Sequence, residues 1–299
     1  MTAAPHPAEN HRAAAPVAIR RATPADAEAC GRICYEAFFR VSQHHNFPAD
    51  IPSPQHAAGF LSALFGHPGV FCVVAEQAGK IVGSNCMDER TAIAGIGPIT
   101  IDPSCQNRSV GRQLMKAVLD RAEERQFKGV RLVQAGYHMR SLSLYTKLGF
   151  IVREPLACLH GPAIRQEISG FRVRPARPDD LHACNAVAFR VHGHDRGGEL
   201  SDSIQAGSAI VVESRGRITG YASSLSFFGH AVSETNEDLQ AMISAAPEIP
   251  PPGLLVPMRN SFLFRWCLGH GFRTTQPQNL MTIGLYNEPA GAYLPSVLY

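Results

Sequence analysis

A short polar stretch, Gln106–Gly111, stands between an apolar run and a helical pattern. The apolar run Ile99–Ile101 predicts the end of a strand. Val110, Leu114 and Val118 recur four residues apart, as they do on one face of a helix. A tight turn before a helix leaves backbone N–H groups without partners at the positive end of the helix dipole. The stretch therefore predicts an anion site that suits a pyrophosphate.

Size and composition narrow the class of protein. The chain has 299 residues, of which 45% are hydrophobic, and this length predicts about two globular domains. A net charge of +3 with scattered Lys and Arg gives no reason to expect nucleic acid. No apolar run approaches the ~18 residues of a membrane span, so no membrane contact is expected. Residues 1–16 lack the apolar core of a signal peptide and are expected to form a disordered tail.

The cysteines and histidines predict neither disulfides nor metal. None of the eight cysteines forms a CxxC pair, and none has a histidine at zinc-finger spacing. Most lie in apolar segments, which favours buried, reduced thiols in a cytoplasmic protein. The segment His192-Gly193-His194-Asp195 could indicate a metal ligand set, but no further ligand cluster accompanies it. We therefore expect no metal.

The pattern along the first half predicts alternating strands and helices around the polar stretch. Thr23, Pro24 and Asp26 suit an N-cap, a first turn and a capping box, so a helix is expected from there to about Phe39. A loop rich in His, Pro and Phe should begin at Val41. The other expected strands cover residues 17–21, 70–76, 80–87, 93–101, 130–135 and 150–153, and the other helices cover residues 55–65, 110–129 and 140–148.

The pattern starts again in the second half. Val173–Asp180 repeats the register of Ile19–Asp26, and Gly271-Phe272 repeats Gly149-Phe150. Residues 213–220 likewise match the hairpin residues 76–83. Three windows in the same order favour a duplication, with one domain at 17–165 and a second at 166–299. The second copy has no counterpart of Gln106–Gly111 and is therefore expected to have lost the anion turn.

Two motifs in the first half resemble those of the GNAT superfamily of acyl-CoA N-acyltransferases. Gln106–Gly111 is similar to the family pattern Gln/Arg-x-x-Gly-x-Gly/Ala, with Ser109 in place of the first Gly. His138–Phe150 is similar to the helix that ends in Tyr-x-x-x-Gly-Phe, with His138 in place of the usual Asn and Tyr145 at the Tyr position. The resemblance covers about residues 17–165. It implies an α/β fold of two tandem GNAT-like domains, each a mixed, mostly antiparallel sheet flanked by helices.

The resemblance also implies a reaction: acetyl transfer from acetyl-CoA, as co-substrate, directly to an amine. A strand edge would bind the pantetheine arm, the turn would bind the pyrophosphate, and Tyr145 would act as the general acid for the departing thiolate. The implied acetyl-CoA-binding residues are Ile99, Thr100, Ile101, Gln106, Asn107, Arg108, Ser109, Val110, Gly111, Arg112, His138 and Ser141.

The acceptor side is less defined. The general base stays open: Asp88, Glu89 and His138 are the nearest candidates, and a weakly basic amine could also lose its proton to water. Glu89 is taken as the catalytic candidate, and Asp88, His44 and His45 as candidates for acceptor binding, although Asp88 and Glu89 could also cap a turn. The acceptor is expected to be a small-molecule or peptide amine. The chain is expected to be a bacterial protein and either a pseudo-dimeric monomer or a homodimer. A non-catalytic acyl-CoA-binding or ligand-sensing protein, and a longer acyl chain, stay open as alternatives.

The second half is expected to assist rather than to acetylate. Cys267 stands at the position of Tyr145 in the repeat, so this copy lacks the acid as well as the turn. It should shape the acceptor pocket or complete a sheet. The closing run, residues 293–299, is apolar enough that we expect it to pack on the body or across the domain boundary.

Overall fold

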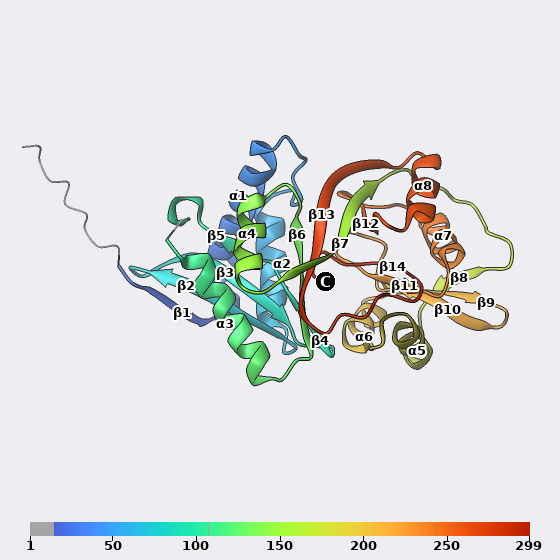
Figure 1. The fold of residues 1–299 in the computed structure, drawn as a ribbon, viewed down its shortest axis with the longest axis horizontal. Helices are drawn as coiled ribbons and strands as arrows, with labels where there is room; N and C mark the ends of the chain where they lie inside the picture. The colour runs from blue at the N-terminus through green and yellow to red at the C-terminus, as the bar shows by residue number, and fades with distance from the viewer. Residues whose placement is uncertain (1–14, 107) are drawn as a thin grey trace, which may run out of the picture.

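The computed structural model describes residues 15–106 and 108–299. They form two lobes along the longest axis of the molecule (Figure 1), one built mainly from each half of the chain. The first half contains β1 (Val17–Arg21), η1 (Pro24–Asp26), α1 (Ala27–His44), α2 (Pro54–Gly66), β2 (Val70–Gln77), β3 (Lys80–Asp88), β4 (Ile93–Ile96), β5 (Thr100–Ile101), η2 (Pro103–Cys105), α3 (Val110–Glu124), β6 (Gly129–Ala135), α4 (Met139–Lys147) and β7 (Ile151–His160). The second half contains β8 (Arg172–Pro175), η3 (Pro178–Asp180), α5 (Leu181–His192), α6 (Gly197–Gln205), β9 (Ile210–Ser214), β10 (Arg217–Ala222), β11 (Ala231–Ser233), α7 (Asn236–Ala245), β12 (Leu254–Pro257), α8 (Ser261–Gly269), β13 (Arg273–Gly284) and β14 (Ala292–Leu294).

One mixed sheet joins the two lobes. Its strand order is β1-β2-β3-β4-β6-β13-β7-β12, and β5 pairs with β3 beside this path. β13 of the second half lies between β6 and β7 of the first, and β7 lies between β13 and β12 of the second (Figure 1). The two halves therefore exchange one long strand each. The sheet is continuous across the predicted boundary at residue 165.

The sheet pairings agree with the predicted fold class. β4 and β6 run parallel, whereas the other pairs of this sheet are antiparallel. A second, antiparallel sheet has the order β14-β11-β10-β9-β8. The prediction of a mixed α/β fold with mostly antiparallel sheets flanked by helices is thus confirmed.

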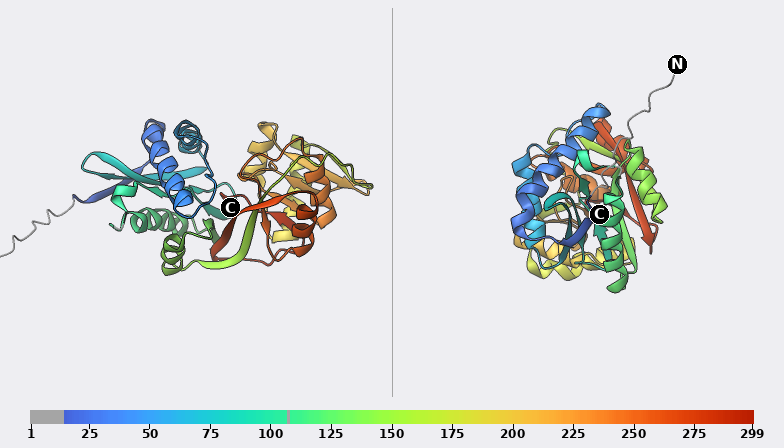
Figure 2. Two further views of the ribbon diagram at one scale, coloured as in Figure 1. Left: turned by 90° about the horizontal axis from the view of Figure 1, so that it is seen from above. Right: turned by 90° about the vertical axis from the view of Figure 1, so that its left-hand side faces the viewer.

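Alternate residues of β2 build the cores on the two faces of the first lobe. Cys72 and Val74 are buried with residues of α1 and α2, such as Leu61. Val73 is buried on the other face, where Leu114 of α3 also lies. The period of two follows from the pleat of a strand. The helices consequently cover both faces of the sheet, as Figure 2 shows from above.

An ion-pair triad occurs once in each half at the positions of the sequence repeat. Arg20 donates two hydrogen bonds of 2.8 Å to Asp26 and one of 3.1 Å to Glu76. Arg174 donates bonds of 2.6 and 2.9 Å to Asp180 and one of 2.7 Å to Glu213. The carboxylates of Asp26 and Asp180 also accept the N–H of the residue three positions earlier, at 2.8 and 2.7 Å. Residues matched by sequence alone therefore have the same geometric role.

Four predicted elements of the first half were wrong in their bounds, among them the strand expected at 150–153, which is β7 and continues to His160. α1 continues to His44, because no residue interrupts the helix before Asn46, which adopts a positive φ of 58°. The strand expected at 93–101 is divided into β4 and β5, since Pro98 has no N–H for a ladder. α3 ends at Glu124, well before the expected stop at Lys128-Gly129. Gln126, with a φ of 56°, supplies the left-handed residue after the helix.

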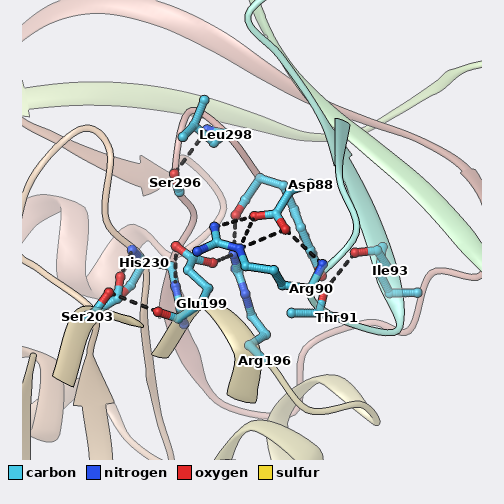
Figure 3. A network of polar contacts seen from close by, with 12 residues as sticks. Asp88, Arg90, Thr91, Ile93, Arg196, Glu199, Ser203, His230, Ser296 and Leu298 are labelled. Carbon is cyan, nitrogen blue, oxygen red and sulfur yellow. Dashed lines mark hydrogen bonds and ion pairs between the residues drawn. The ribbon is translucent and has the colours of Figure 1, made fainter. Parts of the chain in front are cut away.

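The segment after β13 returns to the junction between the lobes, as expected for the closing run. β14 pairs with β11, and Tyr299 is buried between the lobes, where its hydroxyl accepts a hydrogen bond from Arg131. Figure 3 shows the neighbouring polar network. In it Glu199 accepts a 2.6 Å bond from Arg196, and the Leu298 N–H donates to Ser296 at 3.0 Å. These two contacts lie within the second half, and the bond from Arg131 of β6 to Tyr299 holds the segment against the first lobe.

Two further expectations concern the whole chain. All eight cysteines are free and most are buried, as predicted. Among residues 15–106 and 108–299, no helix has both the length and the apolar character needed to cross a membrane. The tail expected at residues 1–16 lies largely outside the described residues.

Candidate active site

The cavity of the first lobe opens where β4 and β6 separate. Their parallel pairing runs from Ile93 with Gly129 to Gly95 with Arg131 and then stops. Beyond this point the segments 96–101 and 132–135 line the two sides of a cavity of about 570 Å³. A strand edge without a partner offers backbone N–H and C=O groups to an extended, amide-containing ligand. The site therefore begins as a gap inside the sheet.

Most of the residues predicted to bind acetyl-CoA line this one cavity. They are Ile99, Thr100, Ile101, Gln106, Ser109, Val110, Gly111, Arg112, His138 and Ser141, and Tyr145 joins them. Arg108 is exposed and is not among the lining residues of the described chain. Asn107 lies outside the described residues.

The turn before α3 has a left-handed residue at the place where the resembled family pattern has Gly. Ser109 is the N-cap of α3 and adopts a left-handed conformation with φ of 63° and ψ of 5°. An L-residue pays for this conformation, whereas Gly does not, which explains why Gly is usual at this place in the pattern. A Cβ on Gly111 would lie 3.2 Å from the Ile101 side chain, so helix and strand approach closely here. The start of α3 consequently faces the strand edge.

Basic side chains gather near the turn. Arg112, Arg140 and Lys147 line the cavity. Arg140 donates a 2.7 Å hydrogen bond to the Gln106 side chain, which ties α4 to the turn. Arg112 in the first turn of α3 and Arg140 beside Gln106, with Lys147 on the same cavity, form a favourable environment for phosphate groups. This part of the cavity is where the charge of an anionic ligand would be balanced.

Tyr145 lies on α4, with its ring against Phe150 in the core and 8% of its surface exposed. Burial raises the pKa of its phenol, so the hydroxyl is protonated at neutral pH. In the described part of the chain this hydroxyl has no hydrogen-bond partner, and the side chain borders the cavity. Its proton is therefore available to a molecule bound there.

His138 is an uncharged member of the site. Burial, followed by the charges of Arg140 and His45, lowers its pKa to about 4. Its carbonyl oxygen accepts hydrogen bonds from the side chains of Gln134, at 3.0 Å, and Ser141, at 2.9 Å. His138 and Ser141 thus belong to a local network that fixes the start of α4 beside the cavity.

The structure does not bring the four predicted acceptor-side residues into the cavity wall. Glu89 accepts hydrogen bonds of 2.7 and 3.2 Å from Arg121, and Asp88 binds Arg90. His44 ends α1, and the ring of His45 stacks obliquely on Tyr137 at 5.4 Å. Among the described residues, none of these four lines the cavity.

Sequence reasoning missed Asp50 and Tyr137, both of which line the cavity. The Tyr137 hydroxyl donates a 3.1 Å hydrogen bond to the Oε1 atom of Gln276 on β13. The Nε2 atom of Gln276 donates to Asp50. Burial raises the pKa of the Asp50 carboxyl, and the bond from Gln276 partly offsets this effect. Asp50 and Gln276 are 226 positions apart, so no local spacing could have indicated the pair.

The second half supplies part of the same wall. Phe227, Phe228, Gln278, Val297 and Leu298 line the cavity together with the residues of the first half. Gln278 reaches it because β13 pairs with β6. Val297 and Leu298 reach it through the segment that follows β14. The site is therefore composite.

The corresponding place in the second half is closed to an anion. α7 starts after Thr235, whose N–H and hydroxyl donate to the Asp238 carboxylate at 3.0 and 2.7 Å. A carboxylate already occupies the positive end of that helix. β14 pairs with β11, the strand at the position of β4, and Cys267 is buried. The described residues contain no group of three or more His, Cys, Asp or Glu arranged to hold an ion.

Comparisons with known proteins agree with this geometry. The model of the acetyltransferase (GNAT) family matches residues 34–150, which include the turn and Tyr145. A putative acetyltransferase from Pyrococcus horikoshii is similar in structure, with a TM-score of 0.70 and 19% identity over 96% of this chain and 97% of that one. No curated protein matched the sequence.

Two further structures have the same arrangement. A GCN5-related N-acetyltransferase from Sphaerobacter thermophilus gives a TM-score of 0.59 at 12% identity and covers 91% of this chain and 96% of that one. A glucosamine N-acetyltransferase region of a fungal multi-domain β-N-acetylglucosaminidase gives 0.62 at 13% identity, over 91% of this chain and 38% of that one. At these identities the similarity establishes the fold. The fold is GNAT-like, and residues 34–150 match an acetyltransferase domain of that family.

Proposed function

We propose that the protein is an N-acetyltransferase that transfers an acetyl group from acetyl-CoA to an amine by direct attack, with Tyr145 as the general acid. The observation that carries the proposal is that one cavity joins the turn before α3, the gap between β4 and β6, and the Tyr145 side chain. The family match over residues 34–150 supports acyl transfer as the class of reaction.

The cavity fits the chemistry of coenzyme A along its length. The pyrophosphate would bind the N–H groups of the turn, with Arg112, Arg140 and Lys147 around it. The pantetheine amides would pair with the open strand edge at Ile99–Ile101. The thioester would then come near Tyr145. Asn107 and Arg108 stay predicted phosphate contacts.

The reaction balances with one net proton released. The acceptor ammonium first gives a proton to a base, and the nitrogen lone pair then attacks the thioester carbonyl carbon. As the C–N bond forms, the C–S bond breaks and its electron pair goes to sulfur, which takes the proton of Tyr145. The proton left on nitrogen returns to the phenolate. A positioned acid of this kind contributes on the order of a hundredfold or more to the rate.

We infer further that the second half, residues 166–299, is a degenerate copy of the first, residues 17–165. The repeated ion-pair triads and the parallel order of elements support the duplication. The strand exchange within one chain supports a pseudo-dimeric monomer. The acceptor would be a small-molecule or peptide amine.

Thiol release from acetyl-CoA with a panel of amines tests the function. We expect Tyr145→Phe to lower kcat roughly a hundredfold with little change in acetyl-CoA affinity. Tyr35→Phe is the matched control, because Tyr35 is a half-buried tyrosine that stacks on Phe39 outside the cavity wall. Tight acetyl-CoA binding without thiol release for any amine would instead identify a ligand-sensing protein.

A further inference from the structure

We propose that the cavity beside Asp50 binds the acceptor as a single ammonium group carried on an apolar or aromatic body, with Asp50 as the partner of the ammonium. This inference rests on the proposed acetyl transfer and names the class of amine. It places the acceptor between the first lobe and the segment of the second half that ends in Leu298.

Charge is the first argument. Asp50 is the one carboxylate among the described residues that line the cavity, and Gln276 is its one hydrogen-bond partner there. A half-buried carboxylate without a cation beside it favours a positive partner, and an amine at neutral pH is an ammonium. The cations of the cavity, Arg112, Arg140 and Lys147, lie with the turn and α4 rather than with Asp50. An ammonium is therefore the group that completes Asp50.

Position is the second argument. Gln276 connects Asp50 to Tyr137, whose hydroxyl bond to Gln276 measures 3.1 Å. Phe47 stacks on Tyr137 with ring centroids 4.2 Å apart. Because Gln276 belongs to β13, the strand exchange fixes the carboxylate from the opposite lobe. Held in this way, Asp50 is placed to orient the ammonium and to accept its proton. Its raised pKa brings it nearer to that of a base working at neutral pH.

The apolar wall is the third argument. Ile51, next to Asp50, packs in the same cluster as Phe60. The ring of Phe60 lies 5.3 Å from that of Phe228, and Leu298 completes the wall from the closing segment. A polyamine would need several carboxylates, whereas the described lining offers one, Asp50, beside aromatic and aliphatic surface. The body of the acceptor is therefore apolar.

Calorimetric titration into the protein saturated with CoA tests the proposal without turnover. The probes are 3-phenylpropylamine, its neutral analogue 3-phenylpropanol, and spermidine. Wild type should bind the phenyl amine more tightly than the alcohol and than spermidine. Asp50→Asn should weaken the phenyl amine roughly ten- to a hundredfold and remove its advantage over the alcohol. Phe228→Ala should weaken the amine and the alcohol alike.

The control is Asp179→Asn, which changes an exposed carboxylate on η3 of the second half and should leave all three affinities unchanged. CoA affinity, measured for every variant, separates the two hypotheses. Failure of the wild-type protein to bind CoA would contradict the proposed function itself. Intact CoA binding with equal affinity for amine and alcohol, with a preference for spermidine, or with unchanged amine affinity in Asp50→Asn would overturn the acceptor assignment alone. The comparison of amine with alcohol in wild type decides the matter even if Asp50→Asn does not fold.

Discussion

Replacing Ser109 with Gly tests the strained backbone at the centre of the proposed pyrophosphate site. Ser109 has a φ of 63°, and its side chain makes no capping hydrogen bond, so the substitution removes no contact of that kind. A non-glycine residue in the left-handed region costs roughly 1–2 kcal/mol. Glycine also increases the conformational freedom of the unfolded chain, which opposes the stabilisation by about 0.5–1 kcal/mol. We therefore expect Ser109→Gly to raise the free energy of unfolding by roughly 0–1.5 kcal/mol.

The matched control is Ser169→Gly. Ser169 is an exposed loop residue that does not have a positive φ. Ser169→Gly increases the freedom of the unfolded chain but relieves no left-handed backbone. It should therefore lower the free energy of unfolding by about 0.5–1 kcal/mol. Urea unfolding of both variants gives the difference, which we expect to be roughly 1–2 kcal/mol. If both substitutions destabilise the protein equally, Ser109 stores no strain and the argument fails. Acetyl-CoA should bind Ser109→Gly at least as tightly as wild type, because the turn keeps its N–H groups.

Two further predictions concern the charges of the cavity. Arg140→Ala should raise the Kd for acetyl-CoA about tenfold and reduce its dependence on salt, because one phosphate contact is lost. Arg125→Ala, an exposed arginine just after α3, should change neither quantity, and an equal effect of both would refute the placement of the phosphates. Asp50→Asn should make the fold more stable than wild type at pH 7. The raised pKa of Asp50 means that its contribution is favourable below the unfolded pKa and is lost as pH rises through the folded one. Thermal melts at pH 4 and pH 7 would show the gap between variant and wild type narrowing in acid, and a gap independent of pH would contradict this reasoning.

The parts of the site that follow the chain closely could be predicted from sequence. The polar turn before α3 and the helix that carries Tyr145 each lie within a dozen residues. In such short segments the spacing of residues along the chain largely determines their arrangement in space. The elements around them followed from hydrophobic periodicity and from local signals such as the capping-box carboxylate of Asp26. Ser109 was identified as the departure from the pattern, and its left-handed backbone shows what that departure costs.

The exchange between lobes was predicted only in outline, as a second half that shapes the acceptor pocket or completes a sheet, and not in the strand or the residues that it uses. Nothing in the sequence of β13 indicates that it enters the sheet between β6 and β7. A strand at the edge of a sheet and a strand between two neighbours can have the same pattern of apolar residues. Asp50 lies in the segment between α1 and α2, where no local pattern distinguishes it from other polar residues. Glu89, by contrast, was a carboxylate directly after a strand, and the structure shows it neutralised by Arg121. A carboxylate gains its role from its partners, and the partners of Asp50 lie in the other half.

The exchange of strands gives a physical reason for retaining a half that has no anion turn. A second half that served only as a scaffold would have to supply one strand to the sheet of the first lobe, and a strand of almost any sequence could do this. Instead β13 places Gln276 against Asp50 and Tyr137. The segment after β14 also places Leu298 in the cavity wall. Because the second half is part of the same chain, its strands are held at a fixed register against those of the first half. The start of its helix α7 is closed by the Thr235–Asp238 cap, while the wall that it contributes to the cavity is in place.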